Sequence, residues 1–360
     1  MSGAISGIGF PALGEIVAGL GQLNQSFDTL TAQASSGLVS QNFAGLGSAA
    51  PVALSLSSEI ANMQTAQTNI NAASGPAAVT QSTMTQIQAI ASNLQSEIPN
   101  LTSLDGGEVD SIAANARSDL AQVADLLDTQ YGDVYVFAGQ DSSNPPVPDP
   151  DQITSSGFFT QISSAVANLS GNGAAATAAA TLAIASSNTA GTSPFSSYMS
   201  QPAAALSPPS VETGNGQSQT LGLLASANTG AVSTGTSTTG SYMRDLMRAL
   251  ATVGSLSSSQ VNDPNFASLV ADTQTSLTGL TSAMSTDVGT LGEQQANLTT
   301  LQTTLSDTQT ALTGQLSSVQ NVDMTATLTN LSQSQTQLQA SYQLIATVSG
   351  LSLAKFLPVS

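Results

Sequence analysis

The feature that most constrains the fold is a seven-residue repeat of large apolar residues near the C-terminus. It runs through Leu291, Leu298, Leu305, Leu312 and Val319. After a break at 321–323, a similar apolar stripe continues to position 345. A sustained heptad predicts long helices that pack along one apolar seam. The spacing fits a coiled coil and a globular helical bundle equally well.

The positions that flank this seam are neutral. In many coiled coils the flanking positions carry Glu and Lys, whose charge pairs choose the partner helix. Here they are mostly Gln, Thr and Ser. We therefore expect shape complementarity, and not charge, to select the partner of these helices.

The N-terminal part of the chain has helical periodicity as well. Apolar residues recur at steps of three and four from Leu13 to Ala34, and Gly37 predicts the end of that helix. The Gly-rich stretch 35–52 predicts a non-helical connector. Helical periodicity resumes over about 54–94 and again over about 109–131. The aromatic and β-branched residues at 135–138, followed by a Pro-rich stretch, predict a short strand or hairpin.

The middle of the chain, 155–240, is dominated by Ser, Thr, Gly, Ala and Asn. It predicts a small β-rich or mixed domain, or a loop-rich insert, and a long disordered linker is the alternative. The expected fold is mainly α, with long N- and C-terminal helices paired as a coiled coil or bundle, a short β-hairpin and a small variable, loop/β-rich middle domain. We expect five parts, at 1–45, 46–154, 155–240, 241–320 and 321–360.

Composition excludes several classes of function. Among 360 residues there is no Cys, His or Trp, and only four residues are basic. Thiol nucleophiles, Cys/His zinc sites and imidazole acid–base catalysis are therefore absent. The net charge of −18 disfavours nucleic acid and anionic membrane surfaces, because both need clustered Lys and Arg. We expect no partner of either kind.

The acidic residues do not form a convincing chemical site. Asp105, Glu108 and Asp110 lie beside a Gly-Gly pair, which is more typical of a helix N-cap than of an acid–base pair. The aspartates of the Pro-rich loop fit no EF-hand spacing and are interpreted as a solvated acidic loop. We expect no enzyme activity, no cofactor and no metal.

The sequence carries no sign of membrane insertion or of a cleavable export signal. The N-terminus lacks a basic region, Glu15 interrupts its apolar stretch, and no segment has 18 uninterrupted apolar residues. The low charge density fits an exported bacterial surface protein. It also fits a protein that faces acid, because few of its groups titrate near pH ~4.

The two ends together resemble the bacterial flagellin family. On the N-terminal side, the family's turn matches Ser36, Gly37 and Leu38, and its Asn-rich helical passage matches 67–73. On the C-terminal side, the matching features are the Asp323-Met324 start, the Gln-rich heptads at 333–339 and the ending at 351–357. The resemblance covers about 1–140 and 240–360, and the unaligned middle corresponds to the family's variable surface insert.

The resemblance implies a secreted structural protein of the bacterial flagellum, exported by a type III route without a cleavable signal peptide. It implies a helical homo-oligomer whose other partners are flagellar junction and cap proteins and an export chaperone. The first interpretation is the filament subunit, and the alternative is the hook–filament junction protein. A coiled-coil surface adhesin is a more remote alternative, and an enzyme is the other class weighed.

Two thin terminal helices cannot bury their apolar faces alone, so we expect them to pack against neighbouring subunits. Helices at 13–34 and 324–352 would line an inner tube, and the bundle from about 50–130 and 245–320 would form an outer wall. The expected self-assembly interface consists of Leu13, Ile16, Leu20, Leu23, Phe27, Leu30, Leu328, Leu331, Leu338, Tyr342 and Ile345.

Overall fold

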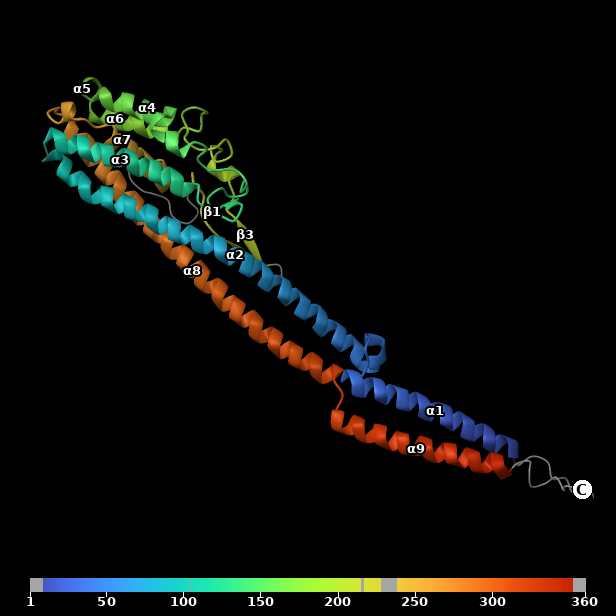
Figure 1. The fold of residues 1–360 in the computed structure, drawn as a ribbon. Helices are drawn as coiled ribbons and strands as arrows, with labels where there is room; N and C mark the ends of the chain where they lie inside the picture. The colour runs from blue at the N-terminus through green and yellow to red at the C-terminus, as the bar shows by residue number, and fades with distance from the viewer. Residues whose placement is uncertain (1–8, 104, 215–216, 228–237, 352–360) are drawn as a thin grey trace, which may run out of the picture. The chain divides into compact units, whose positions relative to one another are not determined.

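The computed structural model describes residues 9–103, 105–214, 217–227 and 238–351 (Figure 1). The chain is mainly α-helical and divides into two compact units. Unit 1 combines 1–63 with 307–360, and unit 2 comprises 64–306. None of the helices that the structure describes combines the length and the apolar character needed to span a bilayer.

Unit 1 is built on a pair of helices from opposite ends of the chain. Helix α1 (Gly9–Ser36) packs against α9 (Met324–Leu351). A 3₁₀ helix, η1 (Phe43–Ala49), leads into α2 (Ala50–Glu97), whose first turns belong to this unit together with the last turns of α8 (Phe266–Gln320). The predicted connector at 35–52 is therefore shorter than expected, because η1 occupies much of it.

In unit 1, the turn that follows α1 and the turn between α8 and α9 are hydrogen-bonded to each other. Gly37 ends α1 in the left-handed conformation (φ +73°), as the sequence predicts, and its N–H donates to the carbonyl oxygen of Gln33 (2.8 Å). The N–H of Val39 donates to the Gln320 carbonyl oxygen (2.7 Å), and that of Val322 to the Gly37 carbonyl oxygen (3.0 Å). The break expected at 321–323 thus lies beside the end of α1.

In unit 2, α2 and α8 lie side by side in opposite directions, joined by neutral hydrogen bonds. These bonds join Gln302 to Asn71, Gln295 to the Ala77 carbonyl oxygen, Gln88 to Ser285 and Gln95 to Thr278, at 2.6–3.2 Å. From the first of these pairs to the last, the residue number rises by 24 along α2 and falls by 24 along α8. Amide and hydroxyl groups therefore help to fix the register of this pair, a role that charge pairs take in many coiled coils.

Helix α3 (Gly106–Leu127) follows the short 3₁₀ helix η2 (Ile98–Thr102). Its start is a capping box, in which Asp105 accepts from the Glu108 N–H (3.0 Å) and Glu108 accepts from the Asp105 N–H (3.2 Å). Asp110 accepts from the N–H of Ser258 (2.7 Å). The interpretation as a helix N-cap environment is confirmed for Asp105 and Glu108, whereas Asp110 bonds to the start of η5 (Ser258–Gln260) instead.

The predicted hairpin exists, but it lies a few residues earlier than expected. Strand β1 (Gln130–Tyr131) pairs with β2 (Val134–Tyr135) in antiparallel register around Gly132, whose φ is +61°. The Gly132 turn sets this position because it needs a left-handed residue. The stretch 136–138, expected as strand, is instead buried in the core.

The middle region is loop-rich, as the sequence predicts, and of the β-rich and mixed alternatives it is the mixed one, because it also contains helices whose positions the sequence did not specify. They are η3 (Pro150–Ser155), α4 (Gly157–Ala167), α5 (Leu169–Asn172), α6 (Ala174–Ala185) and η4 (Ala203–Ala205). Strands β3 (Ser210–Gly214) and β4 (Gln217–Thr220) form a second antiparallel pair. Apolar residues of α4 join those of α2, α3 and α8 in one core.

Helix α7 (Tyr242–Gly254) is buried along its whole length, and it is followed by η5 (Ser258–Gln260). Three arginines are involved: Arg117 of α3 bonds to this helix, and Arg244 and Arg248 belong to it. Arg117 of α3 donates to the carbonyl oxygen of Gly254 at the C-terminal end of α7 (2.5 Å). Arg248 donates to the hydroxyl of Ser276 (2.8 Å) and lies 3.9 Å from a carboxylate oxygen of Asp272. Unit 2 is thus assembled around a helix whose polar groups are bonded to its neighbours.

Replacing Arg117 by Met should lower the free energy of unfolding of unit 2 by about 2 kcal/mol, because a charged donor to the helix end is lost. Urea unfolding at neutral pH, followed by circular dichroism, measures this difference. Asn115→Ala on an exposed position of the same helix serves as the control and should cost much less. Equal stability of the Arg117→Met variant and the wild type would contradict this role of the arginine.

Asp128 should make unit 2 more stable as the pH falls from neutral. The pKa of this carboxyl is raised to about 6. Burial is the main cause, the hydrogen bond from the Val147 N–H (2.8 Å) lowers the pKa, and the negative charge of the neighbouring Asp125 raises it. The folded state thus binds this proton more tightly than the unfolded state, whose pKa is near 3.8. The penalty for the charged form is complete above pH ~6 and vanishes below ~4.

We therefore expect Asp128→Asn to raise the melting temperature at neutral pH and to reduce the gain in stability that the wild type shows between neutral pH and about pH 5. The variant keeps an oxygen that can accept from Val147. Thermal unfolding of both proteins across this pH range gives the comparison. Parallel stability curves for the two proteins would show that this carboxyl titrates as it does in the unfolded chain.

Candidate self-assembly interface

Unit 1 has almost no core of its own. Among its described residues, the buried apolar side chains are Leu46, Ala53 and Leu338. The same unit holds most of the large apolar side chains that are strongly exposed: Val17, Val39, Phe43, Val52, Leu54, Met324, Leu328, Tyr342 and Leu344. Two helices with so little buried apolar surface are marginal on their own. Their exposed faces therefore make unit 1 the candidate interface.

Helix α9 has one face against α1. Its more buried positions follow steps of four and three through Thr327, Leu331, Ser334, Leu338, Ser341 and Ile345. These steps are the a/d spacing of a helix seam. Because small polar residues alternate with the larger apolar ones, the seam is thin. It orders the α1–α9 pair but buries little apolar area.

A second apolar face of α9 remains exposed. Met324, Leu328 and Tyr342 are 40%, 51% and 52% exposed. Residues 324 and 342 are five turns apart and 328 is close to the same line, because the helix has 3.6 residues per turn. The Tyr342 hydroxyl donates weakly to Asn24 Oδ1 of α1 (3.4 Å), so this face borders the seam.

The expected interface residues therefore fall into separate groups. Leu331, Leu338 and Ile345 lie on the seam, whereas Leu328 and Tyr342 lie on the exposed face. Of the residues expected on α1, Leu20, Leu23, Phe27 and Leu30 are half-buried. Leu13 and Ile16 fall within the bounds of α1, but their side chains lie outside what the structure describes.

Sequence reasoning left several exposed apolar residues out of the interface set. Val17 is 61% exposed although it belongs to the periodic stripe of α1, and Leu344 is 52% exposed beside Ile345. Val52 and Leu54, at the start of α2, are 52% and 58% exposed. Their apolar character was visible in the sequence, but their exposure depends on which neighbours the fold supplies.

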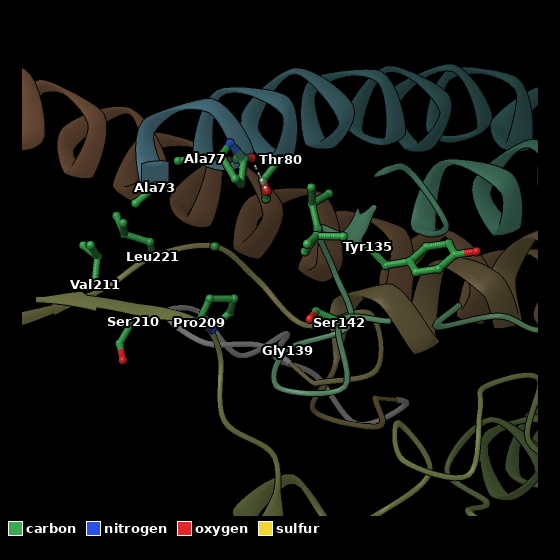
Figure 2. A pocket seen from close by; sticks show the side chains of 14 residues that line it. Ala73, Ala77, Thr80, Tyr135, Gly139, Ser142, Pro209, Ser210, Val211 and Leu221 are labelled. Carbon is green, nitrogen blue, oxygen red and sulfur yellow. Dashed lines mark hydrogen bonds between the residues drawn. The ribbon is translucent and has the colours of Figure 1, made fainter. Parts of the chain in front are cut away.

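Unit 2 contains an apolar cavity of about 220 Å³ between α2, the hairpin and β3–β4 (Figure 2). Pro76, Ala77, Val136, Val211 and Leu221 are among its lining residues, and the Thr80 hydroxyl donates to the Pro76 carbonyl oxygen (2.9 Å). Its described lining contains no Asp, Glu, Lys or Arg. It therefore offers no charged acid or base for chemistry.

Among the residues that the structure describes, no three carboxylates come together in a way that would hold a metal ion. Three of the carboxylates that the sequence singled out have partners of another kind. Asp105 and Glu108 cap α3, and Asp141 of the Pro-rich loop accepts from Asn144 Nδ2 (2.7 Å). These contacts are those of turns and helix ends.

Comparison with known proteins matches both ends of the chain. The bacterial flagellin N-terminal helical region matches residues 16–142, and the bacterial flagellin C-terminal helical region matches residues 274–357. No curated protein matches the chain. The two matched regions together span more than half of the sequence, and they contain α1 from residue 16 onward and the whole of α9. The chain belongs to the bacterial flagellin family, whose members are structural proteins that are exported to the flagellum and assemble into filaments outside the cell.

Proposed function

We propose that this chain is the subunit that polymerises into the flagellar filament and that unit 1 supplies its inner contacts. The observation that carries the proposal is the apolar surface of unit 1, which the chain itself leaves uncovered. A half-exposed Leu or Tyr gains about 1 kcal/mol when a neighbouring copy covers it. Several such residues per subunit, repeated along a polymer, are enough to drive assembly.

The charge distribution supports contact between identical copies. Helix α9 has no charged residue along its 28 positions, although the whole chain has a net charge of −18. Copies that meet along α9 therefore avoid the repulsion that their overall charge would cause. A contact that repeats head to tail without closing gives a helical polymer.

The interface comprises the eleven residues expected from the sequence, with Leu328 and Tyr342 facing neighbouring copies and Leu331, Leu338 and Ile345 ordering α9 against α1. The five-part division at 1–45, 46–154, 155–240, 241–320 and 321–360 belongs to this proposal, as do contacts with junction and cap proteins and an export chaperone, and export without a cleavable signal peptide. No catalytic role is proposed.

The alternative is the hook–filament junction protein of the same family. The stretch from Tyr135 to Gly139, followed by Asn144 and two prolines, resembles that branch. The two functions differ in whether the purified chain grows long polymers. Electron microscopy of seeded protein distinguishes them, because long filaments support the filament subunit and short caps or no polymer support the junction protein.

Deleting residues 1–35 or 325–360 should give a soluble, partly helical protein that does not polymerise, because each deletion removes one helix of the α1–α9 pair. Sedimentation of seeded mixtures measures the polymerised fraction, and circular dichroism measures the remaining helix. Unit 2 keeps its own core in both truncations. Filaments of normal diameter from either truncation would place the inner contacts elsewhere.

Replacing Leu328 by Asp should block polymerisation while leaving the helicity of the monomer unchanged, because this side chain is exposed in the single chain. Burying an unpaired carboxylate between copies costs several kcal/mol. Gln333→Asp, at an exposed position on the other side of α9, is the matched control and should polymerise nearly as the wild type does. Normal filament yield from Leu328→Asp would mean that this face remains in solvent after assembly.

A further inference from the structure

A second cavity in unit 2, of about 340 Å³, lies at the N-terminal end of α7. Its floor is formed by buried residues, which are Ser226, Ala227, Ser241 and Arg244. Its rim is formed by the exposed residues Ser186, Asn188, Gln201 and Ala203. The cavity is thus polar, reachable from solvent and closed at its base by a cation.

Arg244 is held firmly by neutral groups. Its side chain donates to the carbonyl oxygens of Ser226 (3.0 Å), Ala185 (3.0 Å) and Ser187 (3.3 Å), and to Asn188 Oδ1 (2.8 Å). Its guanidinium also lies over the ring of Phe195, 5.0 Å from the centroid. A guanidinium carries five N–H groups. These four hydrogen bonds therefore leave one N–H without an acceptor among the residues that the structure describes.

None of the described residues that line this cavity is a carboxylate. Asp245, the next residue in the chain, accepts from the hydroxyl of Thr238 and from the N–H of Thr239 (2.8 Å). Burial lowers the pKa of Arg244, and no charged neighbour offsets that cost. A buried cation whose bonded partners are all neutral is expensive unless an anion joins it.

The end of α7 adds to the positive potential. Ser241 is the N-cap of this 13-residue helix, so the positive end of the helix dipole lies at the floor of the cavity. The described lining of this cavity thus combines a cation with a helix N-terminus, in a chain whose net charge is −18. Such a lining favours an anionic ligand.

We propose that this cavity binds a small hydroxylated carboxylate, an acidic sugar for example, with its carboxylate on Arg244 and its hydroxyl groups on the rim. A free oxyanion would satisfy Arg244 but would leave most of the cavity unfilled. The amides of Asn188 and Gln201 and the hydroxyl of Ser186 suit the hydroxyl groups of a sugar ring. This site is separate from the assembly surface of unit 1 and does not depend on the proposed polymerisation.

The test is calorimetric titration of the full-length chain, kept below its polymerising concentration, with glucuronate, glucose and inorganic phosphate. We expect glucuronate to bind saturably and to raise the melting temperature of unit 2. Glucose, which has the same ring without the carboxylate, should not bind. Binding of glucose as tight as that of glucuronate, or binding of phosphate alone, would overturn the proposal.

A pair of rim variants tests the charge directly. Gln201 is exposed, so Gln201→Glu and Gln201→Lys should both fold. The Glu variant should weaken glucuronate binding by about fivefold or more, and the Lys variant should tighten it by a similar factor. Arg244→Gln should abolish binding, and if that variant does not fold, the Gln201 pair decides. Equal affinities of the two Gln201 variants would show that glucuronate does not bind in this cavity.

Discussion

Helix α7 and its bonded arginines are the feature on which unit 2 depends. Three of the four basic residues of the whole chain lie here: Arg117 at the C-terminal end of α7, and Arg244 and Arg248 within it. Burying a guanidinium costs free energy unless its N–H groups find acceptors. Each of these arginines therefore fixes one position of a neighbouring segment. Without these hydrogen bonds, a core of Leu, Ala and Met would specify the relative positions of the helices less uniquely.

Unit 1 follows the opposite principle. Its helices have a narrow seam, an exposed apolar face and few buried residues among those described. In the proposed function, its stability comes from contacts with other copies. The chain thus combines a unit with its own core and a unit that needs assembly. This combination fits the proposed function, in which a monomer becomes fully ordered only when it polymerises.

Helices with regular apolar stripes were predictable from the sequence because their signal is local. The end of α1 at Gly37 and the break between α8 and α9 followed from glycine and from the interruption of the stripe. Helix α6 was missed because its buried positions are Thr177, Ala178, Thr181 and Ala185. Small residues of this kind leave no large apolar stripe, and α6 packs only because α4 and α7 lie beside it.

The interface was harder to predict for a different reason. Apolar residues at steps of three and four along α9 form a wide helix face. The sequence alone does not tell which part of that face packs against α1 and which part stays exposed. Only the position of α1 separates Leu338, which is buried, from Leu328, which is exposed. The arginine cluster around α7 could not be predicted from the sequence, because Arg117 lies 127 residues or more before Arg244 and Arg248.

The acidic residues are distributed unevenly between the two units. Only five of the 22 acidic residues lie in unit 1, namely Glu15, Asp28, Glu59, Asp307 and Asp323. The rest lie in unit 2, where water and salt can screen those that are exposed. Repulsion between copies grows with the charge brought into close contact, and the α9 surface brings none. A strongly acidic chain can therefore repeat itself along a polymer because its net charge lies mainly outside the helices that have to meet.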